Sequence, residues 1–273
     1  MTTTHSPTVY VADTLPPRYP GVWAAMKQAF LVAAVETVIL PGTRDVWVRD
    51  YLPTVLPSGD FVQFRYAPDY LQTESGQRSI TDTTNIYAAQ GWQPQLSEVV
   101  LDGGNLVRCG NQVLLTDKVL RENAGWPPQL LVQQLTRELE ADRLVLLPTD
   151  PHDFTGHADG MLHALDERTV LVNDYRREKL WPALRSVLLD AGLDWIFLPY
   201  NPYRNINYDD ATGVYNNFLR LPGLILVPVF NKPEDEVALR QLEQIFPKHR
   251  VLPVLVQELA PAGGLLHCVT WEY

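Results

Sequence analysis

The stretch NLVRCGNQVLLT, residues 105–116, holds two short apolar runs joined by the turn dipeptide Gly110-Asn111. Branched apolar residues on both sides of such a turn predict a β-hairpin. Three more stretches have this form, with turns spaced about 55 residues apart along the chain. They are LPTVLPSGDFVQF (52–64), MLHALDERTVLVN (161–173) and NFLRLPGLILVPVF (217–230). The hairpin is therefore expected to belong to a repeated unit.

A helical pattern and one further apolar strand separate successive hairpins. Apolar residues recur at helical spacing in 184–191 and 238–246, and helices are also expected in 21–36 and 127–142. Short apolar runs such as RLVLLPTD (143–150) follow these helices. The unit therefore has the order helix, strand, loop, hairpin. Five such units need about 275 residues, close to the 273 of the chain.

The fifth hairpin is predicted to be split between the two ends of the chain. A strand holding LLHCVTW (265–271) is expected to pair with PTVYVAD (7–13) and close a ring, which also removes exposed sheet edges. The predicted fold class is α/β, a fivefold pseudosymmetric α/β propeller in a single domain over residues 1–273. An ordinary open α/β sheet is the alternative.

Composition narrows the classes of function. Hydrophobic residues make up 46% of the chain, enough for a large core, but no apolar run is long enough to span a membrane. The net charge of −10 argues against a nucleic-acid partner and suits a small cationic ligand. Two cysteines and an N-terminus without a leader pattern predict a cytoplasmic protein. No metal or cofactor motif occurs, so none is expected; a homo-oligomer is left open.

Residues able to do chemistry fall in loops that follow the strands of the unit. In a closed ring, such loops lie at one end and converge on the axis. The loops are WVRD (47–50), LDGGN (101–105), TGHADG (155–160), NPYRNINYDD (201–210) and GGLLHC (263–268). A cysteine, a histidine and several carboxylates in equivalent places indicate one shared site.

Cys268 is the candidate nucleophile, with a small buried hydrophobic side chain as the alternative. Cys109 lies in the similar run GGNLVRC but one residue out of register, and is interpreted as structural. His157 can transfer protons near neutral pH, and Asp159, on the same side of a strand-like H-x-D, can hold a cation. A satisfied loop histidine is the alternative. Alternation along a strand predicts that His267 faces away from the site.

Other polar residues suit a flat cation. Trp47 and Asp50 offer an aromatic face and a carboxylate, or else form a core tryptophan and a surface ion pair. Asp102 is either a further cation ligand or part of an Asx turn, and Asn105 ends the same LDGGN run. Arg204 is either a clamp for a substrate carboxylate or a solvated loop arginine.

Together these motifs resemble the agmatine deiminase and bacterial-type peptidylarginine deiminase family of guanidine-modifying enzymes, in the pentein superfamily. WVRD is similar to the family's W-x-R-D, LDGGN to its EGGN, and GHAD to its G-H-x-D. VYNNF is similar to its Y-x-NF segment, and GGLLHCVT to its GG-x-x-HC-x-T. The likeness runs from about residue 41 to residue 270. The family fold is a fivefold α/β propeller, in agreement with the repeat.

The resemblance implies that Cys268 is the nucleophile, His157 the general acid and base, and Asp50 and Asp159 the catalytic carboxylates that bind the guanidinium. From the loop residues described above, the further residues expected to bind substrate are Trp47, Asp102, Asn105 and Arg204. The implied reaction turns a guanidino group into a ureido group and ammonia through a covalent thiouronium on the cysteine. Agmatine is the leading substrate, with arginine, peptidyl arginine and other guanidino compounds as alternatives.

The chain departs from the family pattern where the pocket extends beyond the guanidine. Tyr51 and Leu52 follow WVRD where Thr and Gly are common, Asp102 replaces the Glu of EGGN, and Gly160 follows GHAD. These departures leave the substrate open. An amidinotransferase on the same fold and a non-catalytic propeller that only binds a partner are the alternative functions.

Overall fold

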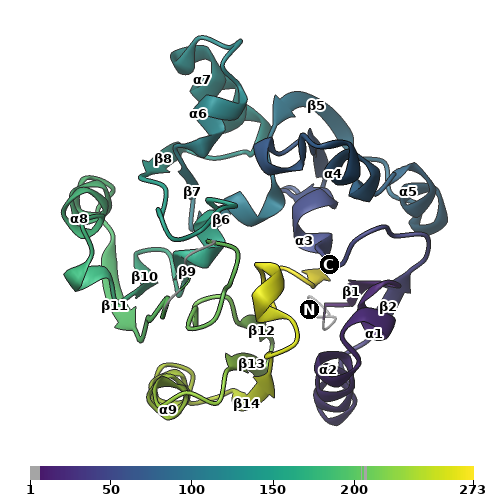
Figure 1. The fold of residues 1–273 in the computed structure, drawn as a ribbon. Helices are drawn as coiled ribbons and strands as arrows, with labels where there is room; N and C mark the ends of the chain where they lie inside the picture. The colour runs from purple at the N-terminus through teal and green to yellow at the C-terminus, as the bar shows by residue number, and fades with distance from the viewer. Residues whose placement is uncertain (1–6, 204, 206–207) are drawn as a thin grey trace, which may run out of the picture.

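The computed structural model describes residues 7–203, 205 and 208–273. Five three-stranded sheets with one repeated strand order surround the centre of the molecule (Figure 1). The sheets are β15 (Trp271–Glu272), β1 (Val9–Ala12) and β2 (Thr37–Leu40); β3 (Thr54–Val55), β4 (Phe61–Arg65) and β5 (Gln95–Val100); β6 (Val107–Cys109), β7 (Gln112–Thr116) and β8 (Arg143–Leu147); β9 (Leu162–Ala164), β10 (Thr169–Asn173) and β11 (Asp194–Leu198); β12 (Leu219–Leu221), β13 (Leu224–Val229) and β14 (Arg250–Leu255). This repetition fits the expected fivefold pseudosymmetry.

In every sheet the middle strand has one antiparallel and one parallel neighbour. β7, for example, pairs antiparallel with β6 and parallel with β8. A tight turn joins the antiparallel pair at Gly110, whose φ of 58° suits glycine better than any residue with a side chain. The parallel partner is reached through a crossover that contains a helix. The four predicted hairpins are thus confirmed.

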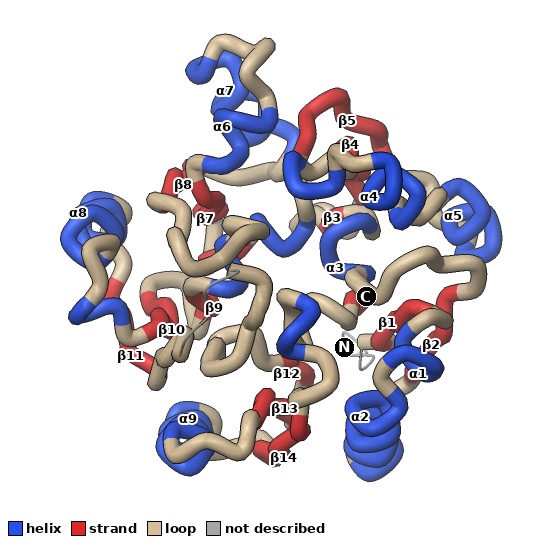
Figure 2. Tube along the Cα trace, in the orientation of Figure 1, coloured by secondary structure: helices blue, strands red, loops and turns tan. Residues whose placement is uncertain are grey.

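Helices form the crossovers between middle and outer strands, except α3, which lies between two sheets. They are α1 (Leu15–Arg18), α2 (Pro20–Val32), α3 (Val48–Tyr51), α4 (Glu74–Ser79), α5 (Thr84–Gln90), α6 (Lys118–Glu122), α7 (Pro128–Glu138), α8 (Trp181–Asp190) and α9 (Glu234–Ile245). The predicted helices are confirmed as α2, α7, α8 and α9, which lie at the rim of the view in Figure 2, while many loops lie nearer the centre. Within the described residues, no helix is long and apolar enough to cross a bilayer.

Burial differs between the middle and the outer strands. All four residues of β1 are buried, and so are five of the six in β13. The outer strand β11 instead alternates between exposed and partly buried positions up to its last residue, Leu198, which is buried. A strand covered on both faces needs a continuous apolar sequence, which explains the apolar runs of β7, β10 and β13, whereas β4 alternates between buried and more exposed positions. These buried strands form a firm frame for the loops that leave the sheets.

The two ends of the chain meet in the first sheet, as the sequence predicts. β15 pairs antiparallel with β1, and Tyr10 lies opposite Trp271. The C-terminal strand therefore takes the place that the first strand of a hairpin occupies in the other four sheets.

The prediction that this strand includes residues 265–270 is wrong. Residues 266–269 form a turn, and only Trp271 and Glu272 are in strand conformation. The hydroxyl of Thr270 donates to the carbonyl oxygen of Leu266 at 2.8 Å. Such local side-chain to backbone bonds stabilise a turn at the expense of a sheet ladder.

Candidate active site

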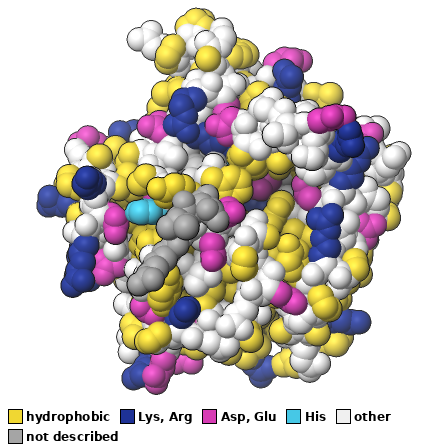
Figure 3. All heavy atoms as spheres, in the orientation of Figure 1, with side chains coloured by type: hydrophobic (Ala, Val, Ile, Leu, Met, Phe, Trp, Pro, Cys, Tyr) yellow, Lys and Arg dark blue, Asp and Glu magenta, His cyan; other side chains and the backbone are white. Residues whose placement is uncertain are grey.

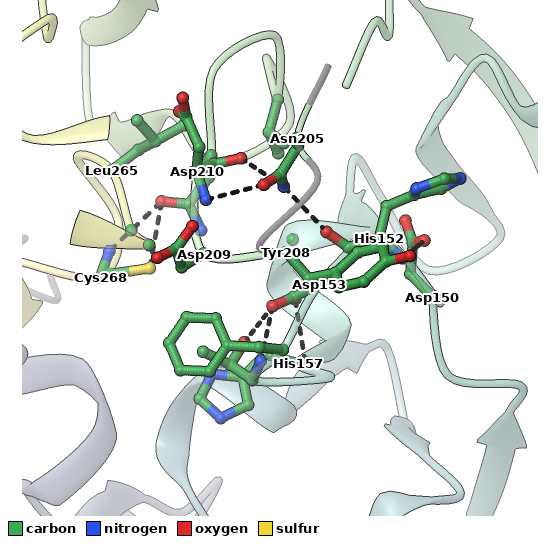
Figure 4. A pocket seen from close by; sticks show the side chains of 18 of the residues that line it. Asp150, His152, Asp153, His157, Asn205, Tyr208, Asp209, Asp210, Leu265 and Cys268 are labelled. Carbon is green, nitrogen blue, oxygen red and sulfur yellow. Dashed lines mark hydrogen bonds between the residues drawn. The ribbon is translucent and has the colours of Figure 1, made fainter. Parts of the chain in front are cut away.

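One cavity near the centre of the molecule is lined by polar side chains from loops far apart in the sequence. Trp47 and Asp50 come from the segment around α3. His157 directly precedes the short 3-10 helix η3 (Ala158–Gly160), and Asp159 lies within that helix. Cys268 comes from the C-terminal turn. Figure 4 shows Cys268 and His157 on different walls of this cavity. The structure therefore brings these five sequence-predicted site residues together.

The Cys268 thiol faces an acidic environment. Its Sγ lies 3.8 Å from Oδ2 of Asp159 and 3.4 Å from Oδ1 of Asn217. Burial, followed by the negative charges of Asp159 and Asp50, raises the pKa of the thiol well above its usual value. Cys268 is therefore a neutral thiol in this environment. A cation between the sulfur and the carboxylates would oppose those causes and favour the thiolate.

The turn that carries Cys268 is held by Asn217. Oδ1 of Asn217 accepts hydrogen bonds from the backbone N–H groups of His267 at 3.2 Å and Cys268 at 3.4 Å. Gly264 lets the same segment pack on Trp47, since a Cβ there would lie 2.4 Å from the indole ring. Asn217, which opens one of the predicted hairpin stretches, is not among the site residues predicted from the sequence. The sequence feature that could have identified Asn217 is its position in the motif VYNNF.

His157 lies between two carboxylates. Its Nε2 is 2.8 Å from Oδ2 of Asp102, and its Nδ1 is 3.6 Å from Oδ1 of Asp50. Burial alone would lower the pKa of His157, but the charge of Asp50 and the hydrogen bond to Asp102 outweigh burial and raise that pKa to about 9. The imidazole is therefore protonated near neutral pH. Nε2–H donates to Asp102, which leaves Nδ1–H on the side of Asp50.

Asp50 approaches His157 closely because Gly104 has no side chain. The backbone N–H of Gly104 donates to Oδ1 of Asp50 at 3.0 Å. A Cβ on Gly104 would lie 2.6 Å from both this oxygen and Nδ1 of His157. Burial raises the pKa of Asp50 to about 7, although the charge of His157 acts in the opposite direction.

Asp159 is held by His267, and the prediction that His267 faces away from the site is wrong. Nδ1 of His267 lies 2.9 Å from Oδ2 of Asp159. Residues 266–269 form a turn, so side chains there do not alternate as they would along a strand. Burial favours the neutral acid, but the hydrogen bond and charge of His267 outweigh it and lower the pKa of Asp159. Asp159 is therefore ionised beside the thiol.

A buried thiol, a protonated imidazole and two carboxylates around one cavity are the groups that the motifs predict for a deiminase. Residues 18–273 match the model of the Porphyromonas-type peptidyl-arginine deiminase family. The chain belongs to this family. Membership makes it a guanidine-modifying hydrolase and confirms the resemblance seen in the motifs.

Relatives and solved structures agree with this assignment. An agmatine deiminase of Pseudomonas syringae pv. tomato is 26% identical over 289 residues, which cover 86% of this chain and 76% of the relative. A variant of C. jejuni agmatine deiminase with substrate bound has a TM-score of 0.77 at 16% identity, covering 98% of this chain and 93% of that chain. A putative arginine deiminase from Porphyromonas gingivalis has a TM-score of 0.70 at 22% identity, covering 98% and 95%. The structural likeness shows that they share a fold.

Asp102 and Asn105, placed by the sequence analysis with the substrate-binding residues, lie behind the cavity of this deiminase. Both are fully buried and are not part of the cavity wall. Oδ1 of Asn105 accepts from the backbone N–H groups of Thr116 at 2.9 Å and Ala158 at 3.2 Å. Asn105 thus ties the end of β7 to the loop of His157. Arg204 lies outside the described residues.

The rest of the cavity wall is aromatic and acidic. Its other aromatic and acidic side chains are Tyr70, Asp150, Asp153, Phe154, Tyr200, Tyr208, Asp209 and Asp210. None of the described lining residues is lysine or arginine. On the face shown in Figure 3, acidic side chains lie near the centre, while most lysine and arginine side chains lie toward the edge. The described residues contain no group of three or more potential ligands arranged to hold a metal ion.

Cys109 lies away from this wall. Its Sγ donates to the carbonyl oxygen of Asp166 at 3.1 Å, and burial raises the pKa of its thiol to about 11. This environment agrees with the structural role predicted for Cys109.

Proposed function

We propose that the protein hydrolyses a guanidino group to a ureido group and ammonia, with agmatine as the leading substrate. One observation carries the proposal: Cys268, His157, Asp50 and Asp159 face the same cavity although they come from separate parts of the chain. A flat cation in this cavity can contact the thiol and the carboxylates together.

In the proposed complex, Asp50 and Asp159 accept paired hydrogen bonds from the planar guanidinium. Trp47 provides an aromatic wall beside it. The bound cation removes the main electrostatic obstacle to ionising Cys268, because it neutralises the two carboxylates that raise the pKa of the thiol. The thiol proton leaves to solvent, and the substrate itself creates the nucleophile.

The thiolate of Cys268 then adds to the guanidinium carbon. Protonated His157 donates to the departing nitrogen, which leaves as ammonia, and a thiouronium remains on the sulfur. Neutral His157 next accepts a proton from water as the water oxygen attacks the same carbon. Collapse of this adduct breaks the carbon–sulfur bond, the sulfur takes up the hydroxyl proton and becomes the thiol again, and the ureido product leaves while His157 stays protonated.

Two observations support agmatine. The relative from P. syringae is named an agmatine deiminase. The described cavity wall also carries Asp209 and Asp210 but no lysine or arginine, so it suits an ammonium tail better than the carboxylate of arginine.

We also propose the closed propeller and the cytoplasmic location that the sequence predicts. We take the five sheets to form a closed propeller in one domain, which the pairing of β15 with β1 supports. We also keep the cytoplasm as the compartment, because Cys109 and Cys268 are both free thiols.

A panel of guanidino compounds tests the proposal. Purified protein is incubated with agmatine, arginine or an arginyl peptide, and ammonia and ureido products are measured. We expect agmatine to give both products in equal amounts. Ammonia from none of the compounds contradicts the proposal. A new guanidino product that appears only when an amine acceptor is added indicates an amidinotransferase instead.

A further inference from the structure

Lys118 is a buried lysine directly behind His157. Its side chain is 1% exposed, and its Nζ lies 2.6 Å from Oδ2 of Asp102. The same oxygen lies 2.8 Å from Nε2 of His157. One carboxylate oxygen thus accepts from an ammonium on one side and from the imidazole on the other. The three groups form a chain that runs from α6 to the cavity.

The surroundings of Lys118 keep it away from the substrate. Glu122, one turn along α6, places Oε1 3.1 Å from Nζ, and Oδ1 of Asp69 lies at 3.8 Å. The ring of Tyr70 covers the ammonium at 4.8 Å. Tyr70 lines the cavity whereas Lys118 does not, so the ammonium touches the site from behind, through Asp102 and Tyr70.

The start of α6 is tied to the loops of the site. Thr116 lies two residues before Lys118. Its hydroxyl group has two acceptors within hydrogen-bond distance, Oδ1 of Asn105 at 2.9 Å and the carbonyl oxygen of Gly156 at 2.6 Å. Gly156 immediately precedes His157. The lysine and the histidine are therefore held on segments joined by short buried contacts, and a buried ammonium needs such fixed partners to be stable.

We propose that Lys118 is a positioning residue of the deiminase reaction, which orients Asp102 so that the His157 ring presents Nδ1 toward Asp50 and the cavity. The inference rests on the proposed role of His157 as acid and base. A general acid must lie within hydrogen-bond reach of the group that it protonates, and small displacements reduce the rate strongly.

Lys118 places a positive charge among the acidic groups that surround His157. The acidic groups facing the imidazole are Asp50, Asp102, Asp153 and Asp159, and the phenol of Tyr70 lies nearby. Lys118 is the positive charge that opposes them: it lowers the pKa of His157 and helps to lower that of Asp102. It therefore keeps Asp102 ionised as an acceptor and keeps His157 able to release its proton.

The test measures the pKa of His157 directly, by NMR titration of its ring signals in wild type, Lys118→Met and Lys118→Arg. We expect the pKa to be higher in Lys118→Met, and Lys118→Arg, which keeps the charge, to restore part of the difference. We also expect kcat on agmatine to fall about 10- to 100-fold in Lys118→Met with little change in KM. Arg121→Met, on the exposed side of the same helix, is the matched control and should behave as wild type.

A second variant protects the test against misfolding. Lys118→Met leaves the buried Glu122 without its cation, so Lys118→Met/Glu122→Gln removes that unpaired charge. The proposal is overturned if a folded Met variant keeps the wild-type pKa of His157 and the wild-type kcat, with a loss of thermal stability only. If wild type deiminates no guanidino compound but the pKa of His157 still rises in the Met variants, the link from Lys118 to His157 stands and the proposed function fails.

Discussion

The Sγ atom of Cys268 lies 3.8 Å from Oδ2 of Asp159, on the wall of the cavity that both residues share. The same oxygen lies 2.9 Å from Nδ1 of His267, which favours its ionised form. An anion beside a buried thiol disfavours the thiolate. In the proposed mechanism, the thiol therefore stays unreactive until a cation enters the cavity.

Guanidinium binding should weaken in acid. The pKa of Asp50 is raised to about 7, so its carboxylate carries a negative charge above pH 7 and loses that charge as the pH falls below this value. In Cys268→Ala, which binds without turnover, we expect the affinity for agmatine to fall about tenfold per pH unit below pH 7. Titration calorimetry measures this, and Asp50→Asn should bind weakly at every pH. An affinity unchanged between about pH 5 and about pH 8 contradicts the role given to Asp50.

Gly104 should not tolerate a side chain. In Gly104→Ala, a Cβ would lie 2.6 Å from both Asp50 Oδ1 and His157 Nδ1, which must then separate. We expect kcat/KM to fall about 100-fold, because the two groups leave their working positions. Gly125→Ala is the control, since a Cβ there meets no atom within 4 Å. Equal activity of the two variants would show that this close approach is not required.

Asn217 should stabilise the turn that carries the nucleophile. In Asn217→Ala, the backbone N–H groups of His267 and Cys268 lose their shared side-chain acceptor. We expect a loss of about 1–3 kcal/mol in the free energy of unfolding and a lower kcat. Denaturant unfolding and steady-state kinetics measure the two effects. Asn111→Ala, at an exposed turn, should change neither, and wild-type kcat in Asn217→Ala would disprove the positioning role.

His267 should protect activity in mild acid. Its hydrogen bond and charge lower the pKa of Asp159, so in His267→Leu that pKa rises and the carboxylate is lost at a higher pH. We expect kcat/KM of the variant to fall more at about pH 6 than at about pH 8, measured by ammonia release. His249→Gln, remote from the cavity wall, is the control. A loss in His267→Leu that is the same at both pH values would argue against this linkage.

The repeat was predictable because its signals are local. Each hairpin turn carries glycine, asparagine, aspartate or proline beside apolar runs, as at Gly110, and such turns are largely set by their own residues. Loops that follow equivalent strands then had to gather near one end of the molecule. The sequence alone therefore predicts that Asp50, His157 and Cys268 lie near one another.

What the sequence did not reveal depends on distant contacts. The turn at 266–269 is held by Asn217, about fifty residues away, in addition to the local bond from Thr270 to Leu266. The placement of His267 against Asp159 follows from that turn. Nothing in the neighbouring sequence distinguishes Lys118 from an exposed lysine on a helix. Only its contacts with Tyr70 and Asp102 show that it is buried.

The central claim is that Cys268 attacks the guanidinium carbon, and acid-quenched mass spectrometry of the enzyme turning over agmatine tests it most directly. We predict that the peptide carrying Cys268 gains the mass of the substrate less ammonia, that the peptide carrying Cys109 does not, and that Cys268→Ala releases no ammonia. Ammonia release by Cys268→Ala at the wild-type rate, with no adduct on Cys268 in wild type at any quench time, would contradict the account.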